Sequence, residues 1–104
     1  YYPHIVGLVA HEGKHLEQGG QTAMSVYGEF EGWQTELAVK KEMFQQIPSY
    51  GTARDIIFRT PLSHTPEVLG MIWRAMVGEQ GFDYGAWILP LDSNDKVPAI
   101  FAGY

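Results

Sequence analysis

The sequence predicts a single α+β domain that is mainly helical, with minor β structure in its C-terminal half. Its 104 residues, 45% of them hydrophobic, match the size of one domain with one modest core. Three long segments carry apolar residues at the spacing of a helix face. Gly and Pro punctuate the chain between them, without an internal repeat or a low-complexity tract, so we expect residues 1–104 to form one unit.

The first helix is expected over about residues 3–18. Pro3 is a favourable first helical position, and the pair Gly19 and Gly20 marks the end of the helix. Its apolar residues recur at helical spacing: Ile5, Leu8, Val9 and Leu16.

The second helix is longer and is expected over about residues 23–46. It begins near Thr22 or Ser25, either of which can cap it, and Pro48 ends it. Its apolar stripe consists of Val26, Phe30, Trp33, Leu37 and Phe44.

A short strand and a third helix are expected next. The apolar run at residues 55–58 indicates a short strand or a buried extended segment. Thr65 followed by Pro66 and an acidic first turn is typical of a helix start, and the helix is expected over about residues 66–80. Its stripe consists of Val68, Leu69, Ile72, Trp73, Met76 and Val77.

The tail contains two short apolar runs, at residues 87–89 and 99–101. The polar turn at residues 92–95 separates them. They can pair as a hairpin or cover the helices.

Composition excludes several classes of function. Twelve acidic against seven basic side chains give a net charge of −5, and the basic residues are scattered, so we expect no nucleic-acid partner. The chain has no signal-peptide pattern, and no apolar run approaches the roughly 18 residues of a membrane span, so we expect a soluble protein. Because the chain begins with Tyr1, we expect a processed protein or an excerpt of a longer one, and the compartment and oligomeric state stay open.

The most informative motif is His11-Glu12-Gly13-Lys14-His15 on the first helix, which fits the pattern His-Glu-x-x-His. Residues four apart lie on one helix face, so both imidazoles can bind a single cation. Glu12 is displaced by about a third of a turn and can take a proton from a metal-bound water as general base. Gly13 costs a helix about 1 kcal/mol relative to Ala, which indicates a close neighbour at that point.

A catalytic zinc site needs a third protein ligand and an exchangeable water. The chain has no Cys, so the ligand must be mainly Glu or His, and the second helix offers Glu29, Glu31 and Glu36. At 100° per residue, Glu29 lies nearer than Glu31 to the apolar stripe, which favours Glu29. Glu31 stays the alternative.

The run Glu29-Phe30-Glu31-Gly32-Trp33 resembles the glutamate helix of the gluzincin metallopeptidases, whose Glu completes the zinc site. Glu29 with Gly32 matches the family's spacing, whereas Glu31-Gly32-Trp33 resembles the run of some larger members. The resemblance covers about the first 45 residues, and the short spacing is similar to that of the minigluzincins. It implies a compact zincin-like domain with an active-site helix and a glutamate helix, about one zinc ion (Zn2+) per chain, and hydrolysis of a peptide or protein substrate.

The resemblance carries two further expectations. Zincins offer the substrate an edge strand, which the tail or residues beyond this sequence would have to provide. Trp33, four residues after Glu29, cannot accept a hydrogen bond from a ligating imidazole, so we expect Tyr27, Gln34 or a backbone carbonyl to do so.

The oxyanion of a hydrolytic reaction needs a polar partner. His64, just before the third helix, is the candidate catalytic residue, followed by Tyr50 and Tyr84.

Three other hypotheses remain. His11, Glu12 and His15 can belong to the solvated face of a surface helix, because chance produces the motif in roughly one such chain in a hundred. The chain can be a non-catalytic helical interaction module, or a pseudoenzyme that retains a metal site. It can also hold a structural zinc that His4 or a second carboxylate saturates.

Overall fold

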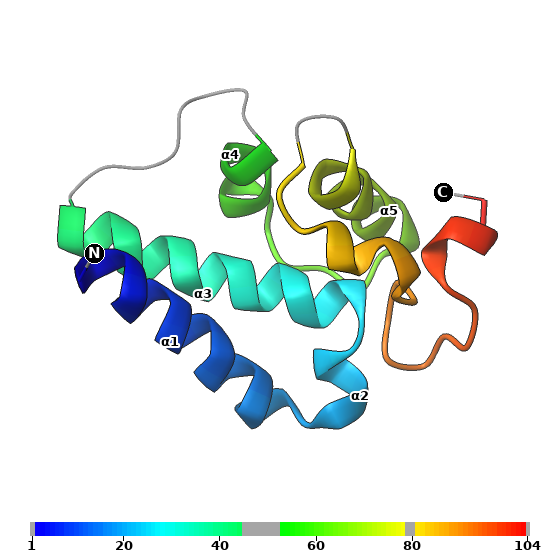
Figure 1. Ribbon diagram of the computed structural model, residues 1–104. Coiled ribbons are helices and arrows are strands. Elements are labelled where there is room, and N and C mark those ends of the chain that lie inside the picture. The colour runs from blue at the N-terminus through cyan, green and yellow to red at the C-terminus, as the bar shows by residue number, and fades with distance from the viewer. Residues whose placement is uncertain (1, 45–52, 79–80, 104) are drawn as a thin grey trace.

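The computed structural model describes residues 2–44, 53–78 and 81–103, and this part of the chain is mainly helical (Figure 1). The helices are α1 (Tyr2–Gln18), α2 (Gly20–Ala23), α3 (Val26–Phe44), α4 (Ala53–Arg59) and α5 (Pro66–Val77). Two short 3-10 helices follow, η1 (Tyr84–Ile88) and η2 (Ala99–Phe101). No helix in the described ranges is long and apolar enough to cross a membrane.

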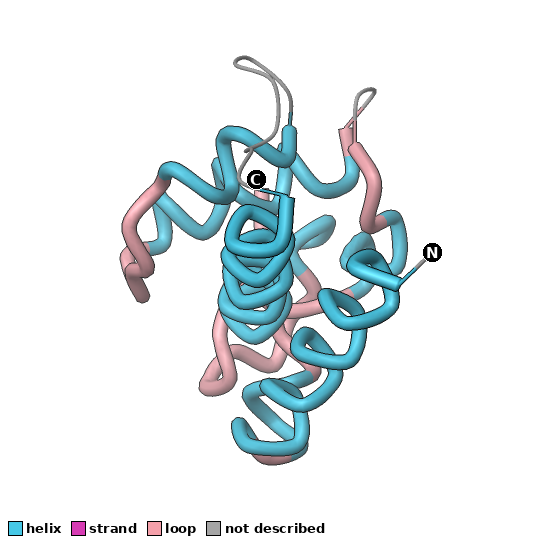
Figure 2. The backbone as a smooth tube through the Cα atoms, turned by 90° about the vertical axis from the view of Figure 1, so that its left-hand side faces the viewer, coloured by secondary structure: helices cyan, strands magenta, loops and turns pink. Residues whose placement is uncertain are grey.

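Helix α3 runs through the middle of the molecule, with α1 along one side and α4 and α5 along the other (Figures 1 and 2). Glycines let α1 and α2 approach α3 closely. A Cβ atom at Gly7 would lie 2.9 Å from Lys40 Cε, and one at Gly28 would lie 1.9 Å from the carbonyl oxygen of Thr22. A larger residue at Gly28 would push α2 away from α3, because the atom that it meets belongs to the backbone.

The hydrophobic core lies between α3, α4, α5 and the tail. Its buried side chains are Val26, Phe30 and Leu37 of α3, Ile57 of α4, Leu69, Ile72, Trp73 and Met76 of α5, and Ala86, Leu91 and Ala99 of the tail. The indole nitrogen of Trp73 donates to the carbonyl of Ala86 at 3.0 Å, so the one polar atom of this buried ring has a hydrogen-bond partner.

The tail also completes the start of α3. The amides of Val26 and Tyr27 donate to the carbonyls of Pro90 and Leu91 at 2.8 and 3.0 Å, and Ser25 Oγ accepts from the third amide of the helix at 3.1 Å. Ser25 is therefore the cap of α3, and the amides of its first turn have partners.

The expected helices are found, with differences at their ends. The first matches α1, and the third begins at Pro66 and ends at Val77 rather than at 80. The second matches α3, which begins at Val26 after the cap Ser25 rather than at 23, and the short helix α2 precedes it. Residues 45–46 and 48, on which the expected end of the second helix falls, lie outside the described ranges.

The expected β structure is wrong for the described residues. Residues 55–58 belong to α4, where Ala53 and Ile57, four apart, are buried, and Arg59 pairs with Asp55 one turn before it. The runs at 87–89 and 99–101 fall largely in 3-10 turns that cover the helices. The two runs meet through a hydrogen bond from the Ala99 amide to the carbonyl of Leu89 and through one isolated β bridge between Pro90 and Pro98. Proline has no amide hydrogen, so these residues cannot extend the bridge into a β ladder.

Candidate metal centre

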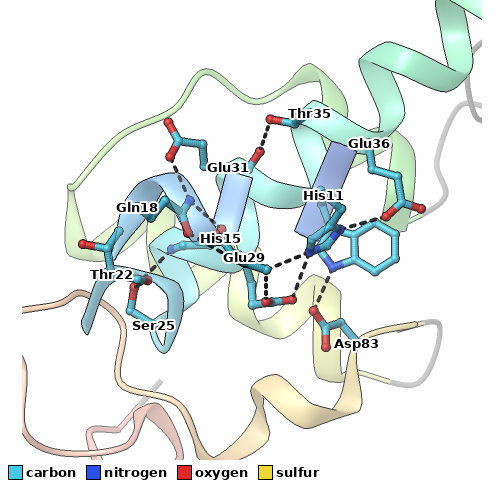
Figure 3. A network of polar contacts seen from close by, with 12 residues as sticks. His11, His15, Gln18, Thr22, Ser25, Glu29, Glu31, Thr35, Glu36 and Asp83 are labelled. Carbon is cyan, nitrogen blue, oxygen red and sulfur yellow. Dashed lines mark hydrogen bonds and ion pairs between the residues drawn. The ribbon is translucent and has the colours of Figure 1, made fainter. Parts of the chain in front are cut away.

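His11 and His15 of α1 and Glu29 of α3 converge on one point (Figure 3). The Nε2 atoms of the two histidines lie 3.0 Å apart, His15 Nε2 lies 2.6 Å from Glu29 Oε1, and His11 Nε2 lies 3.7 Å from Glu29 Oε2. Ligand atoms around a tetrahedral zinc ion, with bonds of about 2.0 to 2.1 Å, lie roughly 3.3 Å from one another. The three groups therefore lie close enough together to hold one metal ion.

Gly32 makes this convergence possible. It lies on α3 between the two histidines, and a Cβ atom there would be 2.8 Å from His11 Nε2 and 3.1 Å from His15 Cε1. The expectation of a close neighbour at Gly13 is wrong, because an added Cβ at Gly13 meets nothing within 4 Å. The glycine that the site requires is the one on the opposite helix.

Glu36 sets the tautomer of His11. His11 Nδ1 lies 2.8 Å from Glu36 Oε1, and Lys40 Nζ holds the other oxygen of this buried carboxylate at 2.7 Å. Because a carboxylate only accepts hydrogen bonds, Nδ1 carries the hydrogen. In the neutral ring, Nε2 then presents its lone pair to His15 and Glu29.

Gln18 sets the tautomer of His15 in the same way. The Gln18 amide nitrogen donates to the carbonyl of Gly28 at 3.1 Å and to Glu31 Oε1 at 2.8 Å, so its oxygen faces His15 Nδ1 at 2.9 Å. His15 Nδ1 is therefore the donor, and its Nε2 is also bare when the ring is neutral. Two lone pairs and a carboxylate facing one another require a cation between them, either a proton or a metal ion.

The pKa values of His11 and Glu29 agree with the requirement for a cation between them. Burial lowers the pKa of His11, but the hydrogen bonds and charges of Glu29 and Glu36 outweigh it and raise the pKa to about 9. Burial raises the pKa of Glu29, and its interactions with His11, Asp83 and His15 outweigh that and lower it to about 2. Without a metal, a proton on His11 therefore balances Glu29.

Asp83, which the sequence analysis missed, reaches this site from the segment after α5. Its carboxyl group accepts the Trp33 indole hydrogen at 2.7 Å (Figure 3). Burial and the neighbouring Glu29 raise the pKa of Asp83 to about 7. No local pattern could join Asp83 to Trp33, 50 positions earlier, since the contact exists only in the fold.

Other residues that the sequence suggested for the site do not lie among the three converging groups. Glu31 faces Gln18 rather than the two histidines, and its backbone carbonyl accepts from the hydroxyl of Thr35. Glu12 is exposed beside His11 on α1. The second imidazole nitrogens bond to Glu36 and Gln18, so the expectation of Tyr27, Gln34 or a backbone carbonyl as acceptor is wrong. Helical spacing could have found Glu36, which lies two turns after Glu29 on the same face of α3.

His64 is not brought to the cluster. It stacks on Tyr27 with ring centroids 4.0 Å apart, and its Nδ1 lies 2.6 Å from Asp92 Oδ2. Tyr27 and Glu29 are about 200° apart around α3, so His64 lies on another side of the helix from Glu29. Tyr84 is exposed on η1, and Tyr50 and the side chain of His4 lie outside the described part of the chain.

No protein-family model, curated protein or solved structure matches this chain. Membership of the gluzincins therefore stays a prediction. The two imidazoles, Glu29 and the side chains that orient them support a metal centre.

Proposed function

We propose that this domain is a zinc-dependent hydrolase, and most simply a peptidase, in which His11, His15 and Glu29 hold the metal and Glu12 is the general base. The observation that carries the proposal is the convergence of three acceptors. Glu36 and Gln18 direct both Nε2 lone pairs toward the same point as the Glu29 carboxylate. A divalent cation satisfies all three groups at once.

The ligand set favours zinc over other abundant cations. Two imidazoles and one carboxylate form a known set of catalytic zinc, whereas calcium and magnesium prefer oxygen ligands. Three protein ligands leave a fourth position for water. The side chains of His15 and Glu29 are 15% and 17% exposed against 6% for His11, so the site opens on the side of His15 and Glu29.

The chemistry that this arrangement supports is hydrolysis. Zinc held by these residues would lower the pKa of a bound water to about 7 and would polarise a carbonyl group. Glu12 lies about 100° from His11 and about 60° from His15 around α1, at the edge of the ligand face. Its carboxylate takes the proton of the attacking water and delivers it to the leaving amine as the carbon–nitrogen bond breaks. His64 has no role in this step, because it lies on another side of α3.

The test combines metal analysis with a Glu12 variant. Wild-type protein should bind about one zinc per chain and cleave an unfolded protein substrate, with new peptide ends found by mass spectrometry. E12Q should keep the zinc and lose about 10²-fold or more of the turnover. The matched control E17Q, an exposed acid on the same helix, should change neither, and H11A should lose the metal.

Each part of the proposal can fail separately. Wild-type protein that binds no zinc overturns the metal site. Wild-type turnover in E12Q overturns the role of Glu12.

A second candidate, a metal-holding domain without catalysis, is favoured by one observation. The described residues contain one isolated β bridge and no strand edge beside α1 to which an extended peptide could add. Zinc-loaded protein that cleaves no substrate would select this candidate.

A further inference from the structure

The two acids that the sequence offered first as the third zinc ligand project from α3 on opposite sides of Gly32. Gly32 faces the histidines of α1, and around the helix Glu29 lies about 60° to one side of it and Glu31 about 100° to the other. Glu29 reaches His15 Nε2 at 2.6 Å. Glu31 reaches the other edge of the same imidazole through Gln18 (Figure 3). Both edges of His15 are therefore held from α3.

Gln18 makes this connection because its two polar atoms have different partners. Its amide nitrogen donates to Glu31 Oε1 at 2.8 Å and to the carbonyl of Gly28 at 3.1 Å, while its oxygen lies 2.9 Å from His15 Nδ1. A glutamine amide can turn over and exchange its oxygen and nitrogen. Turned over, Gln18 would place its oxygen against two acceptors and its N–H against His15 Nδ1.

Glu31 is the stronger of the two acceptors that prevent this reversal. A hydrogen bond to a carboxylate is roughly twice as strong as one to a neutral carbonyl such as that of Gly28. Glu31 is also partly buried, so water competes less for its oxygen than it does at an exposed acid. It does not belong to the three groups that converge on one point, so it acts on them through Gln18.

We propose that Glu31 is a positioning residue that holds Gln18 in the orientation that accepts from His15 Nδ1, and so directs His15 Nε2 toward the metal. This inference rests on the proposed zinc site. An imidazole whose second nitrogen has a fixed acceptor keeps one tautomer and one ring orientation. Because Gln18 can donate as well as accept, it needs Glu31 to fix its direction. For His11, the carboxylate of Glu36 does the same without an intermediate side chain.

Variants of Glu31 separate its hydrogen bond from its charge. E31A removes both. E31Q removes the charge and keeps an oxygen that can accept from Gln18. The matched control E17A removes the charge of an acid on α1 whose side chain is 73% exposed.

The first measurement is zinc affinity, determined by competition with a chelator. E31A should bind zinc about tenfold more weakly than wild type, which is the lower end of the loss caused by removing groups that support a metal ligand. E31Q should bind as tightly as wild type, because the acceptor for Gln18 remains. E17A should also match wild type.

The second measurement separates a positioning role from a general structural one. In the proton NMR spectrum of protein saturated with Co²⁺, the metal shifts the exchangeable N–H signals of the ligating histidines, and the signal perturbed in Q18A identifies His15. In E31A this signal should exchange faster with water, whereas the signal of His11, which Glu36 orients, should stay as in wild type. E31Q should restore the His15 signal.

Wild-type affinity in E31A overturns the inference. An E31Q protein that binds as weakly as E31A also overturns it, because charge rather than the hydrogen bond would then matter, and so does an E31A protein in which both N–H signals change alike. If circular dichroism shows that E31A does not fold, E31D decides, because its shorter side chain keeps the charge and withdraws the oxygens from Gln18. Wild-type affinity in E31D then overturns the inference. Failure of the proposed function is distinguishable, because wild-type protein would bind no zinc at all.

Discussion

Replacing Gly32 by alanine should weaken zinc binding even though alanine is the better helix former. The new Cβ would lie 2.8 Å from both Nε2 and Cδ2 of His11, and 3.1 Å from Cε1 of His15. These atoms belong to rings held on their far sides by Glu36 and Gln18, so they cannot move without breaking those bonds.

The expected size of the effect follows from these distances. An ordinary contact begins at 3.4 Å, so the His11 ring must move by about 0.6 Å. Metal–ligand distances vary by only about 0.2 Å between proteins, so we expect at least about a tenfold loss of zinc affinity. In the metal-free protein, alanine at position 32 stabilises α3 by about 1 kcal/mol relative to glycine, whereas overpacking against the histidines costs about 1 to 3 kcal/mol. The free energy of unfolding of G32A should therefore change little or fall.

Gly13 provides the matched control, because it is an exposed position within α1 where an added Cβ meets nothing within 4 Å. G13A should raise the free energy of unfolding by about 1 kcal/mol and leave zinc affinity unchanged. Chelator competition and urea unfolding of both variants make the comparison. If G32A binds zinc as tightly as wild type, the two imidazoles do not meet beside Gly32, and the proposed centre is refuted.

Three further predictions concern pH, ligand orientation and the core. The raised pKa of His11 stabilises the metal-free protein fully below about pH 6.5, and this stabilisation is lost as the pH rises through about 9. The urea concentration at the unfolding midpoint should therefore fall between these two pH values. A midpoint that does not change with pH would contradict the assignment. Q18A, which removes the acceptor of His15 Nδ1, should weaken zinc binding by about tenfold or more in chelator titrations. W73F removes one of the two donors to the carbonyl of Ala86, which keeps the amide of Leu89, and should lower the free energy of unfolding by about 1 kcal/mol in urea melts.

The sequence was sufficient for features that depend on helical spacing. The apolar periodicity and the terminal signals predicted α1 and α5, and the four-residue interval placed His11 and His15 on one face. The same angular reasoning selected Glu29 over Glu31, and the structure brings Glu29 to the two histidines.

Features that depend on tertiary contacts could not be predicted. Ile56, Ile57 and Phe58 have strand propensity, yet α4 forms because Ala53 and Ile57 are buried on one side of a helix. The contact of Asp83 with Trp33 joins segments 50 positions apart, and no periodic pattern reports such a pair.

The hydrogen bonds from the first turn of α3 to Pro90 and Leu91 connect the proposed metal site to the C-terminal part of the chain. Glu29 lies within the turn that these carbonyls complete, so detachment of the tail would expose the Val26 and Tyr27 amides to water and loosen the ligand-bearing turn. By thermodynamic linkage, an ion bound between α1 and α3 should in return protect the tail from proteases. Cleavage of the C-terminal segment would then release the ion without touching any of its ligands.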